Sequence, residues 1–168
     1  MANISKIITD LDNLSVSNSY TCAPEQCLSY IKEQNKTITA LHLNIRSINK
    51  NFSNLKVFLT RLNFDCDIIV LSECWLSKVA TIPVLEGYTS YCTGNTINQN
   101  DGITIYIKNN IKCSVLEPHF VDANCLVCKL ETDAVFIAIY RPPSFRNIDN
   151  FITSLNNVLN KSTSYTII

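Results

Sequence analysis

The chain has 168 residues, enough for one domain with a single core, and 46% of them are apolar, which excludes an intrinsically disordered protein. Fourteen basic residues balance 14 acidic ones, so the sequence does not show the strong basic excess typical of a duplex-binding module. The eight Cys occur without a signal peptide or an apolar run of membrane length. These features predict an intracellular protein with reduced thiols, located in the nucleus or cytoplasm and not secreted.

The first 37 residues are expected to form a polar leader that contains a short helix. Residues 1–20 are rich in Asn and Ser and are predicted to be weakly ordered. Pro24 occupies a favoured first-turn position for a helix over residues 25–34. The folded domain is therefore predicted to cover residues 38–168.

Residues 39–46 alternate between aliphatic and polar side chains, and this period of two predicts a strand. Asn44 and Arg46 are therefore expected to point the same way near the end of that strand. This polar face is either half-solvated at the edge of a sheet or directed into a cleft. The sequence of the strand by itself leaves both interpretations open.

A helix is predicted over about 49–62, with Asn49 or Asn51 as its N-cap. Residues 67–72 follow directly, and their run of Ile, Val and Leu predicts a strand that is buried on both faces. The order strand, helix, strand predicts two parallel strands joined by a right-handed crossover.

Asn44 and Glu73 stand at the carboxyl ends of these two strands. Parallel strands end at the same edge of a sheet, which is where α/β proteins bind their ligands. An acid at a strand end is either a site residue or a locally paired structural anion. The second polar side chain at the same edge favours a site.

Short strands separated by turn residues are predicted in the second half of the chain, with an antiparallel meander from Asp101 to Tyr140. The predicted strands cover residues 88–92, 103–108, 112–117, 125–130 and 134–140. Pro142 and Pro143 end the last of them, because proline cannot donate a hydrogen bond to the ladder.

A helix capped by Asn147 or Asp149 is predicted after the two prolines. The apolar run at 165–168 then predicts one more buried strand, in which the chain stops. We therefore expect the chain to be a portion of a longer domain.

Two further features are assigned to packing. Cys125 and Cys128 form a CxxC pair within a predicted strand, where residues i and i+3 face opposite sides and chelate a metal poorly. Trp75 is expected to anchor its loop rather than to serve as a platform for stacking bases.

Four blocks of sequence, taken in order and spacing, resemble the endonuclease domain of non-LTR retrotransposons. The blocks are Leu43-Asn44-Ile45-Arg46-Ser47, Leu71-Ser72-Glu73-Cys74-Trp75-Leu76, residues 103–108 and Tyr140-Arg141-Pro142-Pro143. That domain belongs to the endonuclease/exonuclease/phosphatase superfamily, which includes apurinic endonucleases. From about Ile38 onward, the resemblance implies an α/β fold, a four-layer α/β/β/α sandwich that is incomplete because its C-terminal part is missing.

The resemblance implies Mg²⁺-dependent hydrolysis of phosphodiester bonds in DNA, in an element whose endonuclease acts together with a reverse transcriptase during retrotransposition. Asn44, Glu73 and Tyr140 match the family's catalytic residues. Glu73, with Asn44, would hold the metal, and a carboxylate suits a hard cation. Tyr140 would donate a hydrogen bond to the scissile phosphate, and Arg46 and Arg141 are candidate phosphate contacts. DNA is the implied partner; no membrane and no obligate protein partner is expected.

The sequence departs from the family at several points. The Gly-Asp-x-Asn block and the Asp-His pair are absent, and neither His42 nor His119 stands in a matching motif. Asp101 places an acid in a turn that phosphate would approach. With one metal carboxylate, this chain is expected to bind Mg²⁺ weakly, and without a general base it is expected to be nearly inert.

Three functions therefore remain open. The chain is part of a DNA endonuclease, a catalytically inactive remnant or interaction module, or a small-molecule phosphatase of the same superfamily.

Overall fold

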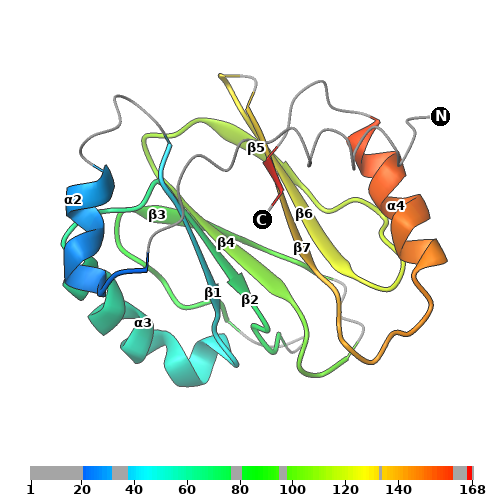
Figure 1. The fold of residues 1–168 in the computed structure, drawn as a ribbon, viewed down its shortest axis with the longest axis horizontal. Helices are drawn as coiled ribbons and strands as arrows, with labels where there is room; N and C mark the ends of the chain where they lie inside the picture. The colour runs from blue at the N-terminus through cyan, green and yellow to red at the C-terminus, as the bar shows by residue number, and fades with distance from the viewer. Residues whose placement is uncertain are drawn as a thin grey trace.

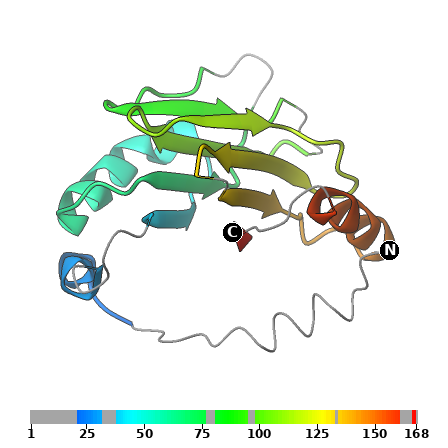
Figure 2. The same ribbon diagram turned by 90° about the horizontal axis from the view of Figure 1, so that it is seen from above.

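The computed structural model describes residues 21–31, 38–76, 81–94, 98–132, 134–160 and 166–167. In this part of the chain two four-stranded sheets lie face to face, as Figures 1 and 2 show. Helix α3 (Ile48–Leu62) packs on the outer face of the first sheet and helix α4 (Asp149–Leu159) on that of the second. The predicted four-layer α/β/β/α sandwich is confirmed.

The first sheet has the strand order β1-β2-β4-β3. Its strands are β1 (Ala40–Asn44), β2 (Ile68–Ser72), β3 (Tyr88–Cys92) and β4 (Ile103–Lys108). β1 and β2 run parallel and are connected through α3, which confirms the predicted parallel pair. β2 is buried at every position, also as predicted.

The second sheet has the order β5-β6-β7-β8. Its strands are β5 (Cys113–Leu116), β6 (Asn124–Leu130), β7 (Val135–Tyr140) and β8 (Thr166–Ile167). The pairing of β5, β6 and β7 is antiparallel, whereas β8 runs parallel to β7. The predicted continuous meander is wrong in one respect, since β4 belongs to the first sheet. β4 pairs with β2 on one side and β3 on the other, which leaves β5 no free edge of β4 to join.

Apolar side chains fill three layers between these elements. Leu55 and Leu62 of α3 pack on the outer face of the first sheet, and the inner faces of the two sheets pack together. Cys128 lies between the sheets, whereas Cys125 lies on the α4 side of β6. The prediction that the CxxC pair faces opposite sides of a strand is confirmed, and all eight Cys are free thiols.

The beginnings of the two long helices differ from the predictions. Ser47 caps α3, because its Oγ accepts a hydrogen bond from the backbone N–H of Lys50 at 3.4 Å. The prediction of Asn49 or Asn51 as this cap was therefore wrong. The N-cap of α4 is Ile148, which makes no side-chain cap hydrogen bond, so the prediction of Asn147 or Asp149 as this cap was also wrong. The N–H of Asp149, the first helical residue, donates to Asn147 Oδ1 at 2.8 Å.

The N-terminal part of the described chain forms a short 3₁₀ turn, η1 (Pro24–Gln26), and a helix, α2 (Cys27–Ile31). Glu25 forms an ion pair with Arg61 of α3 at 2.7 Å, which ties this segment to the first layer. The rest of the predicted helix and the predicted weakly ordered segment 1–20 lie outside the described residues. No helix in the described ranges is long and apolar enough to cross a membrane.

Candidate active site

The ends of β1 and β2 stay hydrogen-bonded beyond the strands themselves. Asn44 pairs in register with Ser72, and the N–H of Ile45 donates to the carbonyl of Ser72 at 3.0 Å. The N–H of Ser47 then donates to the carbonyl of Glu73 at 2.8 Å. These bonds hold Asn44 and Glu73 side by side at the carboxyl edge of the parallel strands.

One carboxylate oxygen of Glu73 accepts two hydrogen bonds. Asn44 Nδ2 donates to Glu73 Oε1 at 2.6 Å, and the Tyr140 hydroxyl donates to the same oxygen at 3.3 Å. Tyr140 is the last residue of β7 and comes from the second sheet, so the cluster joins both sheets. In the described part of the chain no hydrogen bond reaches Glu73 Oε2. The structure thus brings together the three side chains that the sequence analysis names as catalytic candidates.

The backbone at this edge is strained. Six described non-glycine residues have a positive φ, and four of them lie here: Arg46 (46°), Ser47 (80°), Glu73 (52°) and Trp75 (53°). A left-handed conformation costs free energy for residues other than glycine, and such residues gather at functional sites. The concentration of strained residues around Glu73 supports a site at this edge.

The side chain of Asn51 holds part of the strained backbone. Its Nδ2 donates to the carbonyls of Ile45 at 2.9 Å and Arg46 at 2.7 Å. A side chain in the first turn of α3 therefore fixes the loop between β1 and α3. Asn51 does not cap the helix, because α3 begins three residues before it, at Ile48.

Neither arginine of the predicted site forms a hydrogen bond to Glu73. Arg46 was predicted to share a face with Asn44, but β1 ends at Asn44 and Arg46 takes a left-handed conformation, so the strand alternation does not reach it. Arg141 Nη2 donates to the carbonyls of Phe145 at 2.6 Å and Asn147 at 3.0 Å. Arg141 therefore fixes the loop between β7 and α4.

Asp101 lies inside the protein rather than on the surface. Its side chain is 2% exposed, and its Oδ2 accepts a hydrogen bond from the N–H of Asn98 at 2.7 Å. The expectation that this acid meets an approaching phosphate is wrong. The carboxylate of Asp101 lies beneath the protein surface and accepts a hydrogen bond within its own turn.

Asn124 is a supporting residue that the sequence analysis missed. It is buried opposite Tyr140 in the ladder between β6 and β7, and its Oδ1 accepts a hydrogen bond from Gly102 N–H at 3.2 Å. The carbonyl of Gly102 in turn accepts from Cys74 N–H at 3.1 Å. A Cβ on Gly102 would lie 2.8 Å from the Leu76 side chain, so only glycine fits this link. The predicted strand began one residue after Asn124, which hid its pairing with Tyr140.

Tyr140 is held in its neutral form. Burial raises the pKa of its hydroxyl to about 12, and the Glu73 carboxylate, which is both a nearby negative charge and a hydrogen-bond acceptor, adds to the increase, as does the charge of Asp101. The phenol is therefore a hydrogen-bond donor at neutral pH.

Replacing Glu73 with Gln is expected to lower the pKa of Tyr140 while leaving it above the ordinary value of 10.0, because burial remains the largest cause of the shift. The pKa follows from ¹³Cζ NMR signals of the tyrosines across a pH titration, with Tyr140→Phe to assign the resonance. The raised pKa means that Tyr140 adds stability below pH 10 and loses that contribution as the pH approaches 12. An unchanged Tyr140 pKa in Glu73→Gln would refute the contact between phenol and carboxylate.

Comparisons with known proteins show which solved structures share this fold. No family model and no curated protein matches the sequence. The 3′ phosphatase NExo from Neisseria, solved bound to a product DNA hairpin, matches with a TM-score of 0.60 at 14% identity, over 78% of this chain and 56% of that one. The catalytic domain of Xenopus laevis APE2 matches with a TM-score of 0.52 at 15% identity, over 77% of this chain and 56% of that one. The chain has the endonuclease/exonuclease/phosphatase fold.

TDP2 from C. elegans also matches this fold, with a TM-score of 0.50 at 11% identity. That match covers 96% of this chain and 55% of TDP2. The chain thus spans a little over half the length of these structures of the endonuclease/exonuclease/phosphatase fold.

The donor set at Glu73 fits a hard divalent cation with few protein ligands. The described residues contain no cluster of three or more His, Cys, Asp or Glu that could enclose a metal. Glu73 Oε2 and the amide oxygen of Asn44 remain available as oxygen ligands, because Oε1 and Nδ2 bind each other. Mg²⁺ is commonly held by one or two carboxylates, substrate phosphate and water, and this set of oxygens suits it.

Proposed function

We propose that this chain is the N-terminal portion of a Mg²⁺-dependent DNA endonuclease that cuts phosphodiester bonds for the transposition of a non-LTR retrotransposon, together with a reverse transcriptase. The observation that carries the proposal is the meeting of Asn44 and Tyr140 on one oxygen of Glu73. Residues 1–37 serve as the leader and residues 38–168 as the beginning of the nuclease domain. The eight free thiols support a location inside the cell.

In this mechanism each side chain of the cluster has a distinct role. Asn44 orients the Glu73 carboxylate through Nδ2, and Glu73 Oε2 would hold the cation. Mg²⁺ held there would stabilise the charge that develops on the phosphate and the leaving oxygen. The neutral Tyr140 hydroxyl donates to a phosphate oxygen when substrate enters. Arg46 contacts the DNA backbone from the exposed loop, and Arg141 holds the loop that follows Tyr140.

The fold comparisons support DNA rather than a small phosphorylated molecule as the substrate. One similar structure is a 3′ phosphatase bound to a product DNA hairpin. The four sequence blocks resemble the retrotransposon branch of the superfamily. The general base, absent from the residues assigned here, would come from the part of the protein beyond this chain.

A Mg²⁺ titration of this chain tests the proposed metal site. We expect added Mg²⁺ to shift the NMR signals of the Asn44 side-chain amide in the wild-type chain and to leave them unshifted in Glu73→Ala, because the only carboxylate ligand is then lost. Glu86→Ala is the control, since Glu86 is an exposed acid outside the cluster. Equal shifts in the wild type and Glu73→Ala would refute the metal assignment.

A non-catalytic interaction module is the second candidate, and the balance of 14 basic and 14 acidic residues favours it, because a DNA-binding surface usually carries a basic excess. The two candidates predict different results in the same titration. A module without a retained metal site shows no Mg²⁺-dependent shift at Asn44 in the wild-type chain.

A further inference from the structure

Trp75 is the only Trp of the chain, and it stands two residues after Glu73. Its side chain is 40% exposed, whereas the residues on either side of it, Cys74 and Leu76, are 0% and 7% exposed. A large aromatic side chain is thus kept partly in water beside the candidate active site. Within residues 71–76, Trp75 is the exposed residue in a segment that is otherwise buried or half-buried.

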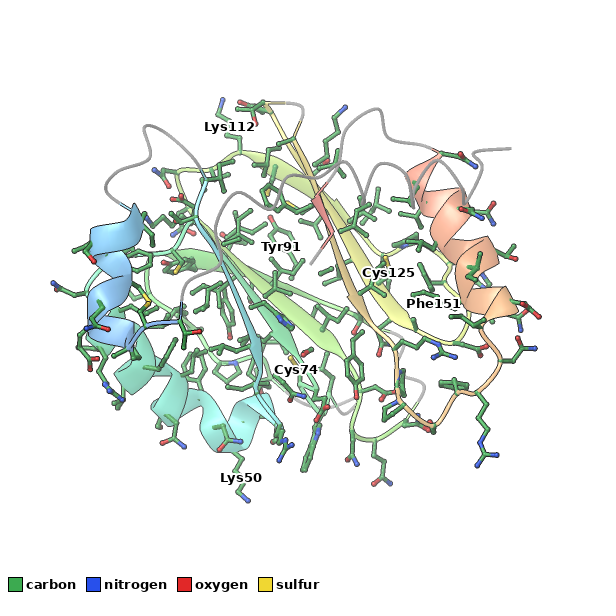
Figure 3. The ribbon with its side chains drawn as sticks, viewed as in Figure 1. Lys50, Cys74, Tyr91, Lys112, Cys125 and Phe151 are labelled. Carbon is green, nitrogen blue, oxygen red and sulfur yellow. The ribbon has the colours of Figure 1, made fainter. Side chains whose placement is uncertain are left out.

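The backbone around Trp75 fixes this exposure. The N–H of Cys74 donates to the carbonyl of Gly102 at 3.1 Å, and the N–H of Leu76 donates to the carbonyl of Asp101 at 3.4 Å. Cys74, labelled in Figure 3, and Leu76 belong to the core beneath α3. With these two side chains committed to the core, Trp75 between them lies on the outer side, and Glu73 before them is half-buried.

Trp75 also has an unfavourable backbone conformation, with a φ of 53°. A positive φ is a genuine outlier for a bulky residue, because its Cβ crowds the backbone. Glu73 has nearly the same φ, 52°. Glu73 and Trp75 thus share the same left-handed backbone conformation.

Trp75 lies close to Glu73 along the chain. Two residues span at most about 7 Å between their Cα atoms, so a phosphate bound at Glu73 lies about one nucleotide from Trp75. Every base has a π face that an aromatic ring can bind, without sequence preference. That face is open only where the base is unstacked from its neighbours, in a single strand, a gap or a strand end.

We propose that Trp75 stacks on an unpaired base adjacent to the phosphate bound at Glu73, and that the protein prefers DNA whose nucleotide at the cut is terminal or unpaired, including base pairs opened by negative supercoiling. This inference rests on the proposed nuclease function for its substrate. The stacking contact is made by Trp75 itself, so an oligonucleotide can bind there without the metal, whereas the position of the phosphate at Glu73 depends on the cation.

Intrinsic fluorescence tests the contact directly, because all tryptophan emission comes from Trp75. The probe is a short oligothymidine single strand, added to the chain in EDTA. We expect its binding to quench the emission, and a blunt duplex of the same length to quench it much less. Absence of quenching, or equal quenching by the blunt duplex, would overturn the proposal.

Variants then separate stacking from packing, with affinity read from the anisotropy of a labelled oligothymidine. We expect Trp75→Ala to bind about tenfold more weakly and Trp75→Phe to stay within about threefold of the wild type, because phenylalanine keeps a stacking face. Val57→Ala, an exposed position on α3, is the matched control and is expected to bind like the wild type. Equal losses in Trp75→Phe and Trp75→Ala, with thermal midpoints unchanged, would show that stacking is not the interaction.

The hypothesis of a metal site at Glu73 and the hypothesis of stacking on Trp75 can be refuted independently of each other. If Trp75→Ala weakens oligothymidine binding in EDTA while the Mg²⁺ titration shows no site at Glu73, the nucleic-acid contact stands and the nuclease function fails. If Mg²⁺ binds at Glu73 and oligothymidine affinity is the same in Trp75→Ala as in the wild type, the nuclease function stands and the role of Trp75 is refuted.

Discussion

Replacing Glu73 with Gln in the protein that carries this chain is expected to slow Mg²⁺-dependent nicking of supercoiled DNA by about a thousandfold or more. The side chain keeps its size and one oxygen that can accept from Asn44 Nδ2, so the local structure is retained. The lost negative charge removes the carboxylate that the proposed metal needs. The rate at which supercoiled plasmid converts to nicked circles measures the effect.

Two comparisons make the Glu73 result specific. Glu86→Gln makes the same chemical change at an exposed acid outside the cluster and is expected to nick at the wild-type rate. The thermal midpoint of Glu73→Gln is expected to match the wild type, which excludes unfolding as the cause. Wild-type nicking by Glu73→Gln would remove Glu73 from the active site and the proposed mechanism with it.

Replacing Tyr106 with Ala is expected to lower the free energy of unfolding by about 3–5 kcal/mol. Tyr106 is fully buried in the central strand β4, and its ring centroid lies 6.3 Å from that of Phe52 of α3. The substitution leaves a cavity between α3 and the first sheet. Because folded domains are stable by only about 5–15 kcal/mol, this single change removes a large part of the total. Urea denaturation followed by circular dichroism measures the loss.

Tyr106→Phe separates the hydrogen bond from the packing. The hydroxyl of Tyr106 donates to the carbonyl of Pro83 at 2.6 Å, and its removal is expected to cost about 1–3 kcal/mol because this carbonyl loses its donor. Val84→Ala, at a position that is 87% exposed, is expected to change stability by less than about 0.5 kcal/mol. A loss in Tyr106→Ala no larger than that in Val84→Ala would contradict the packing of β4 against α3.

The sequence contained the information for the elements whose causes are local. Ile68 to Leu71 gave a strand buried on both faces because no polar side chain interrupts the run. The apolar stripe of α3 predicted a helix between two strands. The order strand, helix, strand in turn predicted that the two strands are parallel, as they are. Asn44 and Glu73 were therefore expected at one edge, where they form a hydrogen bond. The opposite faces of Cys125 and Cys128 followed from the period of a strand.

Only the tertiary structure decided the contacts between segments far apart in the chain. Tyr140 reaches Glu73 from the second sheet across 67 residues, and no local period fixes that approach. The division of the strands between the sheets depends on which edges of β4 are already paired. Asp101 turns inward because a backbone N–H meets its carboxylate there. Sequence periodicity therefore determined the strands to within a residue or two of their ends, whereas packing between the two sheets decided which of their end residues meet.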